Sequence, residues 1–250
     1  MDLAIAGKRA LVLGASRGLG AASARALLAE GVEVHAVSRS GTACDPAVHA
    51  IAADLSDPVA LEALLEQIAT LGPIDILIAN TGGPRPGPAL GVPPADWLAY
   101  FQAMALSLFR VADAVLPGMI ARQWGRIITI GSTGIEQPIA GLALSNAIRG
   151  SVAGWSKTLA AEVAPHGVTV NMVLPGRIDT DRVRELDALR SEATALPLDE
   201  VKERAIGEIP AGRYGDPAEF GAVVAFLAGR PAAYVTGSML RVDGGLIRSI

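Results

Sequence analysis

The stretch LALSNAIRGS, residues 142–151, places two polar side chains one helical turn apart. Ser145 carries a hydroxyl that can donate or accept a hydrogen bond, and Arg149 carries a permanent positive charge. Residues four apart on a helix lie on the same face, so a helix here brings the two groups together. The pair suits an active site. It equally suits a polar helix face that contacts solvent or a neighbouring subunit.

A second pattern with chemical meaning is GASRGLG, residues 14–20. Gly14, Gly18 and Gly20 lie between an apolar run and a helical pattern. Glycines allow the backbone to turn tightly there and to approach a pyrophosphate, whose charge is favoured by free N–H groups and the helix dipole. The alternative is a tight turn without a ligand. The position after the first predicted strand favours dinucleotide binding.

Two arginines indicate which dinucleotide would bind. A site for NAD usually has an acid at the end of the second strand, where it binds the ribose 2′-hydroxyl. This chain has Ser38 and Arg39 there, and Arg17 lies within the glycine loop. Guanidinium groups bind phosphate bidentately. The pattern therefore predicts NADP(H) in preference to NAD(H), unless one or both arginines are solvated surface side chains.

The elements that position these groups alternate between apolar strands and helical patterns. Such alternation predicts a parallel sheet covered on both faces, either a closed β/α barrel or an open doubly wound sheet. The glycine loop at the first strand–helix junction favours the α/β doubly wound, Rossmann-type sheet. Strands are predicted at 9–13, 33–37, 48–52, 74–79, 125–130, 168–173 and 238–242, with helices near 18–30, 57–71, 95–121, 142–164 and 217–228. We find no repeat or linker, so residues 1–250 are predicted to form one domain.

Composition argues against several other classes of protein. With 51% hydrophobic and 18% charged residues, the chain can bury a large core. A net charge of −4 without a basic block disfavours nucleic-acid binding. The apolar runs are shorter than the roughly 18 residues of a membrane span, and the N-terminus is unlike a signal peptide. Cys44 is the only cysteine and the three histidines are scattered, so no metal site is predicted. We expect a cytoplasmic protein that acts on small molecules.

Six motifs resemble the short-chain dehydrogenase/reductase family, and in particular its members similar to 3-oxoacyl-carrier-protein reductase. The resemblance covers almost the whole chain and implies a seven-stranded parallel sheet, an NAD(P)-dependent oxidoreductase and a homo-oligomer, usually a tetramer and otherwise a dimer. The motifs are GASRGLG (14–20), ADLSD (53–57), IANTGG (78–83), GRIITIGS (125–132), VNMVLPGRIDT (170–180) and VTGSMLRVDGG (235–245).

The resemblance also implies cofactor contacts at matching positions. Asp54 and Leu55 would lie at the adenine, although Asp54 also suits a cap that begins the next turn. Asn80 and Gly82 would lie beside the adenine-side ribose. The glycine loop adds Ser16 and Leu19 to its glycines, and the nicotinamide carboxamide would be lined by Pro175, Gly176, Ile178 and Thr180.

The catalytic positions of the family are largely changed in this chain. Ser132 occupies the position of the serine that orients the carbonyl. Ser145 replaces the tyrosine that donates the proton, and Arg149 replaces the lysine that lowers its pKa. Met104 replaces the asparagine that holds a relay water. No lysine follows any tyrosine by four residues elsewhere, so the Tyr-x-x-x-Lys unit is absent.

These changes weaken the expected proton transfer. A serine hydroxyl is a much weaker acid than a phenol, and loss of general acid–base help costs about 10²–10⁴ in rate, roughly 3–5 kcal/mol. Arg149 can donate to ribose hydroxyls but cannot shuttle a proton. Met104 suggests a drier wall, or is simply core filler. Ser132 has the alternative role of bonding backbone at a strand end.

Other polar groups nearby extend the candidate site. Glu136, Asp179 and Asp181 are possible replacement acids, or surface and cap residues. The charged segment 181–209 lies where the family has a substrate lid, and the arginines at its start would attract an acidic ligand; a solvated amphipathic helix is the alternative. These arginines are Arg177, Arg182 and Arg184. Two functions remain open: an NADP(H)-dependent oxidoreductase with an atypical catalytic set, and a non-catalytic dinucleotide-binding protein that serves as a sensor or partner subunit.

Overall fold

Seven parallel strands form one sheet in the computed structural model, which describes all residues from 1 to 250. Their order across the sheet is β3-β2-β1-β4-β5-β6-β7, which confirms the predicted doubly wound Rossmann-type fold. Every strand run expected from the sequence is present, with ends shifted by no more than two residues. The strands are β1 (Arg9–Leu13), β2 (Glu33–Ser38), β3 (His49–Ala52), β4 (Ile76–Ala79), β5 (Gly125–Ile130), β6 (Val168–Pro175) and β7 (Met239–Val242).

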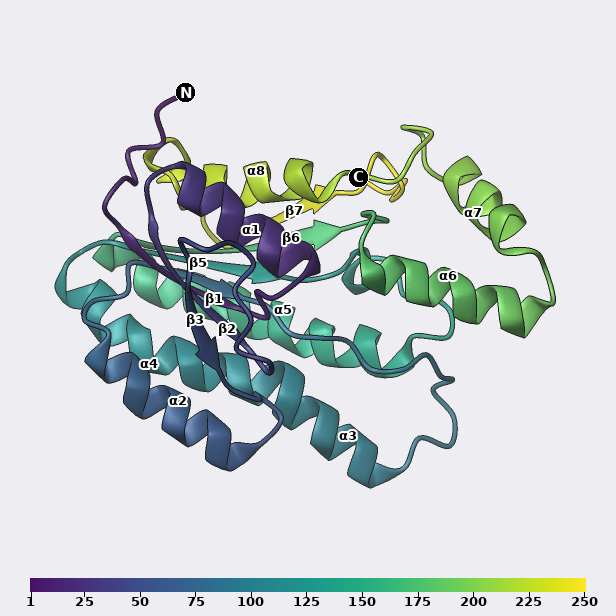
Figure 1. The fold of residues 1–250 in the computed structure, drawn as a ribbon, viewed down its shortest axis with the longest axis horizontal. Coiled ribbons are helices and arrows are strands. Elements are labelled where there is room, and N and C mark those ends of the chain that lie inside the picture. The colour runs from purple at the N-terminus through teal and green to yellow at the C-terminus, as the bar shows by residue number, and fades with distance from the viewer.

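Helices cover both faces of this sheet (Figure 1). α1 and α8 pack together on one face, over a core that includes Val12, Ile78 and Phe220. α2, α4 and α5 cover the other face, while α6 and α7 extend beyond one end of the sheet. The helices are α1 (Gly18–Ala29), α2 (Pro58–Thr70), α3 (Pro94–Phe101), α4 (Ser107–Ala121), α5 (Ala143–Val163), α6 (Asp181–Thr194), α7 (Leu198–Gly207) and α8 (Pro217–Ala228).

Two of the predicted helical segments differ in detail from the structure. The expected helix at 95–121 consists of α3 and α4 joined by a π-helical segment, Gln102–Leu106. The lid-like segment 181–209 is two helices, because Ala195 adopts a left-handed conformation at φ 53° and Pro197 follows it. The stretch Pro94–Ala121 is long and apolar enough to cross a membrane, yet 50% of its most apolar window is buried inside the protein, as in a core helix.

The first turns of the helices differ in a way that matters for ligands. Asp57 caps α2 by accepting a hydrogen bond of 2.9 Å from the amide of Val59. Asp216 and Glu219 form a capping box at the start of α8. The N-terminus of α1 follows Arg17 and has no side-chain cap. The α1 amides are therefore left for another acceptor.

Candidate active site

The glycine loop connects β1 to α1 at the carboxyl edge of the sheet. Gly14 and Gly18 have φ angles of +63° and +59°, which side chains rarely allow. A side chain on Gly20 would place its Cβ only 2.2 Å from the carbonyl oxygen of Gly14. The loop is thus pressed against its own helix, and its uncapped amides form a cradle that suits the diphosphate of a dinucleotide.

Asn80 fixes this loop from the neighbouring strand. β1 and β4 lie side by side although they are not consecutive, which makes this the switch point where open α/β sheets bind ligands. The Asn80 amide donates to the carbonyl oxygens of Leu13 and Gly14, at 3.2 and 3.3 Å. A side chain on Gly14 would collide with that amide at 2.6 Å. Asn80 therefore positions the cofactor loop, in addition to any contact with a ribose.

The predicted adenine end lies at the carboxyl ends of β2 and β3. Ser38 is buried, whereas the neighbouring Arg39 is exposed. The hydroxyl and amide of Ser56 both donate to Asp54 and lower the pKa of this carboxyl, and the charge of Arg39 lowers it further. Asp54 thus has the cap-like role that the sequence offered as an alternative. This role does not prevent a contact with the cofactor. Leu55 packs against the core beneath the turn.

The segment after β6 reaches across to the glycine loop. Gly176 packs so closely that a Cβ would lie 2.7 Å from Cα of Asp243. Ile178 and Thr180 are buried. Thr180 caps α6, with Oγ1 accepting from the amide of Val183 at 3.4 Å, and its methyl group lies beside Gly18. The cofactor residues predicted after β6 therefore face those predicted after β1.

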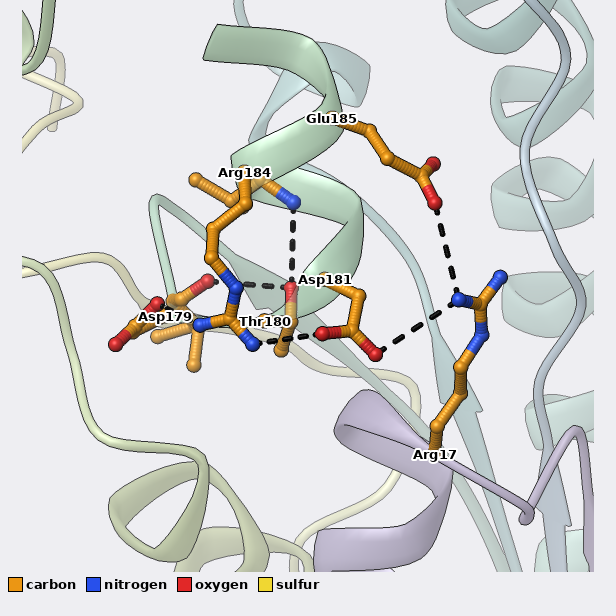
Figure 2. A network of polar contacts seen from close by, with 8 residues as sticks. Arg17, Asp179, Thr180, Asp181, Arg184 and Glu185 are labelled. Carbon is orange, nitrogen blue, oxygen red and sulfur yellow. Dashed lines mark hydrogen bonds and ion pairs between the residues drawn. The ribbon is translucent and has the colours of Figure 1, made fainter. Parts of the chain in front are cut away.

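Acidic side chains of α6 lie over Arg17, as Figure 2 shows. Nη1 of Arg17 lies 3.7 Å from Asp181 and 3.7 Å from Glu185. All three side chains are about half exposed, so these pairs are weak, on the order of 0–1 kcal/mol each. These two carboxylates of α6 supply the counter-charge of Arg17, and a phosphate can compete with them.

Ser132 stands at the end of β5 and caps a short 3₁₀ turn. Its Oγ accepts a hydrogen bond of 3.0 Å from the amide of Gly134. The backbone role considered for this serine is therefore real. The bond uses a lone pair, so the hydroxyl proton stays available to a substrate carbonyl. Asn146 holds the following loop by pairing with both backbone groups of Ile139.

Ser145 and Arg149 lie on α5, as the sequence predicts. The Ser145 hydroxyl makes no hydrogen bond within the protein. Nη1 of Arg149 donates to the carbonyl oxygen of Ile130 at 3.0 Å, and Nη2 reaches that of Thr81 at 3.5 Å. Burial, together with the nearby charge of Arg182, lowers the pKa of Arg149 to about 10. Arg149 thus remains cationic at neutral pH.

Met104, at the position where the resemblance implies an asparagine, is a core residue in this structure. Met104 is only 3% exposed and lies in the π-helical segment. The cavity beside it measures about 10 Å³, which is at the limit for a single water molecule. A chain of waters has no room there. The cavity is lined by Met104, Leu108, Thr129, Ile130, Gly131, Arg149, Val152 and Met172.

The three candidate replacement acids are all engaged in ion pairs. Glu136 pairs with Arg241 at 2.5 Å. Asp179 and Asp181 both pair with Arg184, at 2.5 and 2.7 Å. A neighbouring cation favours the ionised carboxylate, and the hydrogen bond from Arg184 lowers the pKa of Asp181. The structure thus places all three carboxylates in ion pairs with arginines.

Helix α6 is held in place by a buried triad that sequence reasoning missed. Asp187 of α6 has no exposed surface and accepts from Arg177 at 2.6 Å and from the hydroxyl of Tyr214 at 2.8 Å. The three residues are far apart in sequence, and no local pattern marks them. Arg177 and Arg184 are therefore paired with carboxylates of the same chain, whereas the only ion pair of Arg182 is a longer one, 3.6 Å to Glu185.

Comparison with known proteins agrees with this geometry. A family model described as enoyl-(acyl carrier protein) reductase matches residues 14–247. The 3-oxoacyl-[acyl-carrier-protein] reductase FabG of Vibrio cholerae is 38% identical over 248 residues, covering 96% of this chain and 97% of the relative. The FabG of Escherichia coli is 37% identical with the same coverage.

Two solved structures share the whole fold. L-sorbose reductase from Gluconobacter frateurii, complexed with NADPH and L-sorbose, has a TM-score of 0.90 and 28% identity, with 100% of both chains covered. A point variant of actinorhodin polyketide ketoreductase with NADPH has a TM-score of 0.88 and 32% identity, with 97% of this chain and 98% of that one covered.

The chain belongs to the short-chain dehydrogenase/reductase family of oxidoreductases. Within that family it resembles the 3-oxoacyl-carrier-protein reductases.

Proposed function

We propose that this protein is an NADP(H)-dependent oxidoreductase that acts on a carbonyl or hydroxyl substrate with an atypical catalytic set. The observation that carries the proposal is the preserved cofactor cradle beside Ser132 and Arg149. The uncapped amides of α1 and the glycines that no side chain can replace suit a dinucleotide. The bound cofactor supplies the hydride. Relatives of this fold whose structures contain NADPH support the preference for NADP(H).

The residues of this chain would act by hydrogen bonding and charge. Ser132 donates its hydroxyl proton to the substrate oxygen, and Ser145 lies one turn before Arg149 with a free hydroxyl. The fixed charge of Arg149, one turn from Ser145, makes the surroundings of that oxygen electropositive. The proton comes from solvent, because no side chain here replaces the phenol. Slow turnover is the expected result.

A non-catalytic dinucleotide-binding protein is the second candidate. It is favoured by Met104, which fills the relay position, and by the ion pairs that hold Glu136, Asp179 and Asp181. In both cases we propose a cytoplasmic homo-oligomer, as a tetramer or dimer.

Fluorescence titration with NADPH and NADH tests the cofactor claim, and a panel of ketones and aldehydes then tests turnover. We expect NADPH to bind more tightly than NADH. Consumption of NADPH above background supports the enzyme. No saturable binding of either nucleotide contradicts both candidates. A flat panel in which only the Met104→Asn, Ser145→Tyr, Arg149→Lys variant becomes active favours the non-catalytic protein.

A further inference from the structure

Two guanidinium groups from different helices meet over the backbone of Gly83. Arg149 comes from α5 and Arg182 from the first turn of α6. A Cβ placed on Gly83 would lie 3.9 Å from Nη2 of Arg149 and 3.6 Å from Nη2 of Arg182. Gly83 is exposed, so the strip of backbone that both cations face is accessible. Gly82, just before it, has no atom near its missing side chain.

Arg149 has no carboxylate partner. It makes no ion pair within 4.0 Å, and its hydrogen bonds end on two backbone carbonyls. Arg149 is partly buried, so the absence of a counter-charge costs free energy, and a second cation beside it adds repulsion. Folding alone gives no reason to bring Arg182 close to Arg149. The arrangement is explained if an anion joins them.

Arg182 has only one carboxylate partner, at a longer distance than a hydrogen bond. Its Nη2 donates to the carbonyl oxygen of Pro84 at 2.5 Å, and its only ion pair, at 3.6 Å, is with the half-exposed Glu185. Glu185 is also shared with Arg17. The two other arginines near the start of α6 are neutralised, since Arg177 pairs with Asp187 and Arg184 with Asp179 and Asp181. A positive field therefore remains at Gly83.

Arg126 shows what a purely structural arginine without a carboxylate partner looks like. Arg126 is 2% exposed and also lacks a carboxylate. Its guanidinium instead lies over the ring of Trp124 at 4.5 Å and donates to the carbonyl oxygens of Gly125 and Gly167. It lies at the start of β5, at the opposite edge of the sheet from Ser132. Neither Arg149 nor Arg182 has such an aromatic partner.

We propose that Arg149 and Arg182 bind the anionic group of the substrate, so that the substrate is an oxo acid or hydroxy acid carrying a carboxylate or phosphate. The site lies next to the hydroxyls that would meet the carbonyl: Arg149 follows Ser145 by one turn and bonds to Ile130, two residues before Ser132. The inference rests on the proposed oxidoreductase function. The cofactor also carries phosphates, which are the other possible source of an anion here.

The test is binding of short oxo acids to the protein saturated with NADP⁺. The probes are 2-oxobutanoate, acetoacetate and 4-oxopentanoate, each compared with its methyl ester by isothermal titration calorimetry. At least one acid should bind about tenfold or more tightly than its ester. Arg149→Gln and Arg182→Gln should each weaken that acid about tenfold to a hundredfold, as expected for a lost charge-assisted hydrogen bond.

Arg184→Gln is the matched control, because this arginine lies on the same helix with its charge already neutralised. It should leave acid binding unchanged. Arg182 is partly exposed, so its variant keeps the test valid if loss of Arg149 unfolds the protein.

Three outcomes overturn the inference. In the first, the acids and their esters bind equally to the NADP⁺ complex, or neither binds. In the second, the arginine variants bind the acids as tightly as the wild type does. In the third, the acids bind only the protein without nucleotide and compete with NADPH. The last outcome assigns both arginines to the cofactor phosphates. Direct titration with NADPH distinguishes failure of this inference from failure of the proposed function. If the proposed function fails, no nucleotide binds. If only this inference fails, NADPH still binds.

Discussion

Tyr214 donates a hydrogen bond of 2.8 Å to Asp187, a carboxylate with no exposed surface. Arg177 holds the other oxygen of the same carboxylate at 2.6 Å. These contacts join three segments: the loop after β6, the lid helix α6 and the loop before α8. Helix α6 is thus anchored by one buried ion pair and one phenol, and its position depends on them.

Asp187→Asn should strongly destabilise the protein. Removing one partner of a buried pair leaves the other charge uncompensated, which costs about 3–5 kcal/mol. Urea unfolding measures the loss. Asp199→Asn, on the exposed start of α7, is the control and should change the free energy of unfolding by less than about 0.5 kcal/mol. A loss for Asp187→Asn no larger than that of the control would contradict the anchoring role.

Tyr214 should make the lid sensitive to alkali. Burial raises the pKa of Tyr214 to about 12, helped by its hydrogen bond to Asp187. The unfolded phenol titrates near pH 10. The unfolded state thus loses its proton first, so this stabilisation is complete below pH 10 and is lost as the pH rises towards 12. Unfolding measured from pH 9 to 12 should show a steeper loss in the wild type than in Tyr214→Phe. Parallel curves would exclude this role.

The acidic side chains over Arg17 should oppose cofactor binding. Asp181→Asn with Glu185→Gln removes the internal partners of Arg17 and should tighten NADPH binding, by up to about fivefold for each of the two pairs, which are worth about 0–1 kcal/mol each. Glu192→Gln, on the same helix but outside any ion pair, should have no effect. Fluorescence titration measures all three proteins.

Arg17→Gln should weaken NADPH binding selectively. It should weaken NADPH about tenfold or more and leave NADH nearly unchanged, because only NADPH has a 2′-phosphate for the guanidinium to bind. An equal loss for both nucleotides would place Arg17 elsewhere on the cofactor.

Local patterns predicted most of the fold. The apolar runs indicated seven strands, because a buried strand needs consecutive apolar residues. The glycine loop favoured an open sheet over a barrel, because a tight turn needs glycines at nearby positions. The π-helical segment around Met104 was missed, since its apolar residues fit an ordinary helix equally well. The family resemblance implied where a tyrosine and a lysine would stand, and the sequence has Ser145 and Arg149 at those positions.

Long-range pairing explains what local patterns could not predict. Glu136 meets Arg241 across 105 residues, and Asp187 meets Tyr214 across 27. Charged residues on the surface of a helix look alike whether or not a distant partner neutralises them. Only the structure shows that Arg184 is neutralised while Arg182 and Arg149 face each other over Gly83.

Gly20→Ala tests the cofactor cradle itself. The added Cβ would lie 2.2 Å from the carbonyl oxygen of Gly14 and 2.9 Å from the amide of Asn80, so the glycine loop must move away from its helix. We expect NADPH affinity to fall more than about tenfold and the protein to lose about 1–3 kcal/mol of stability, as for other overpacked sites. Gly207→Ala, where nothing lies within 4 Å, is the matched control and should bind NADPH normally while gaining up to about 1 kcal/mol from helix propensity. If Gly20→Ala binds NADPH as tightly as this control, the diphosphate does not lie on the glycine loop.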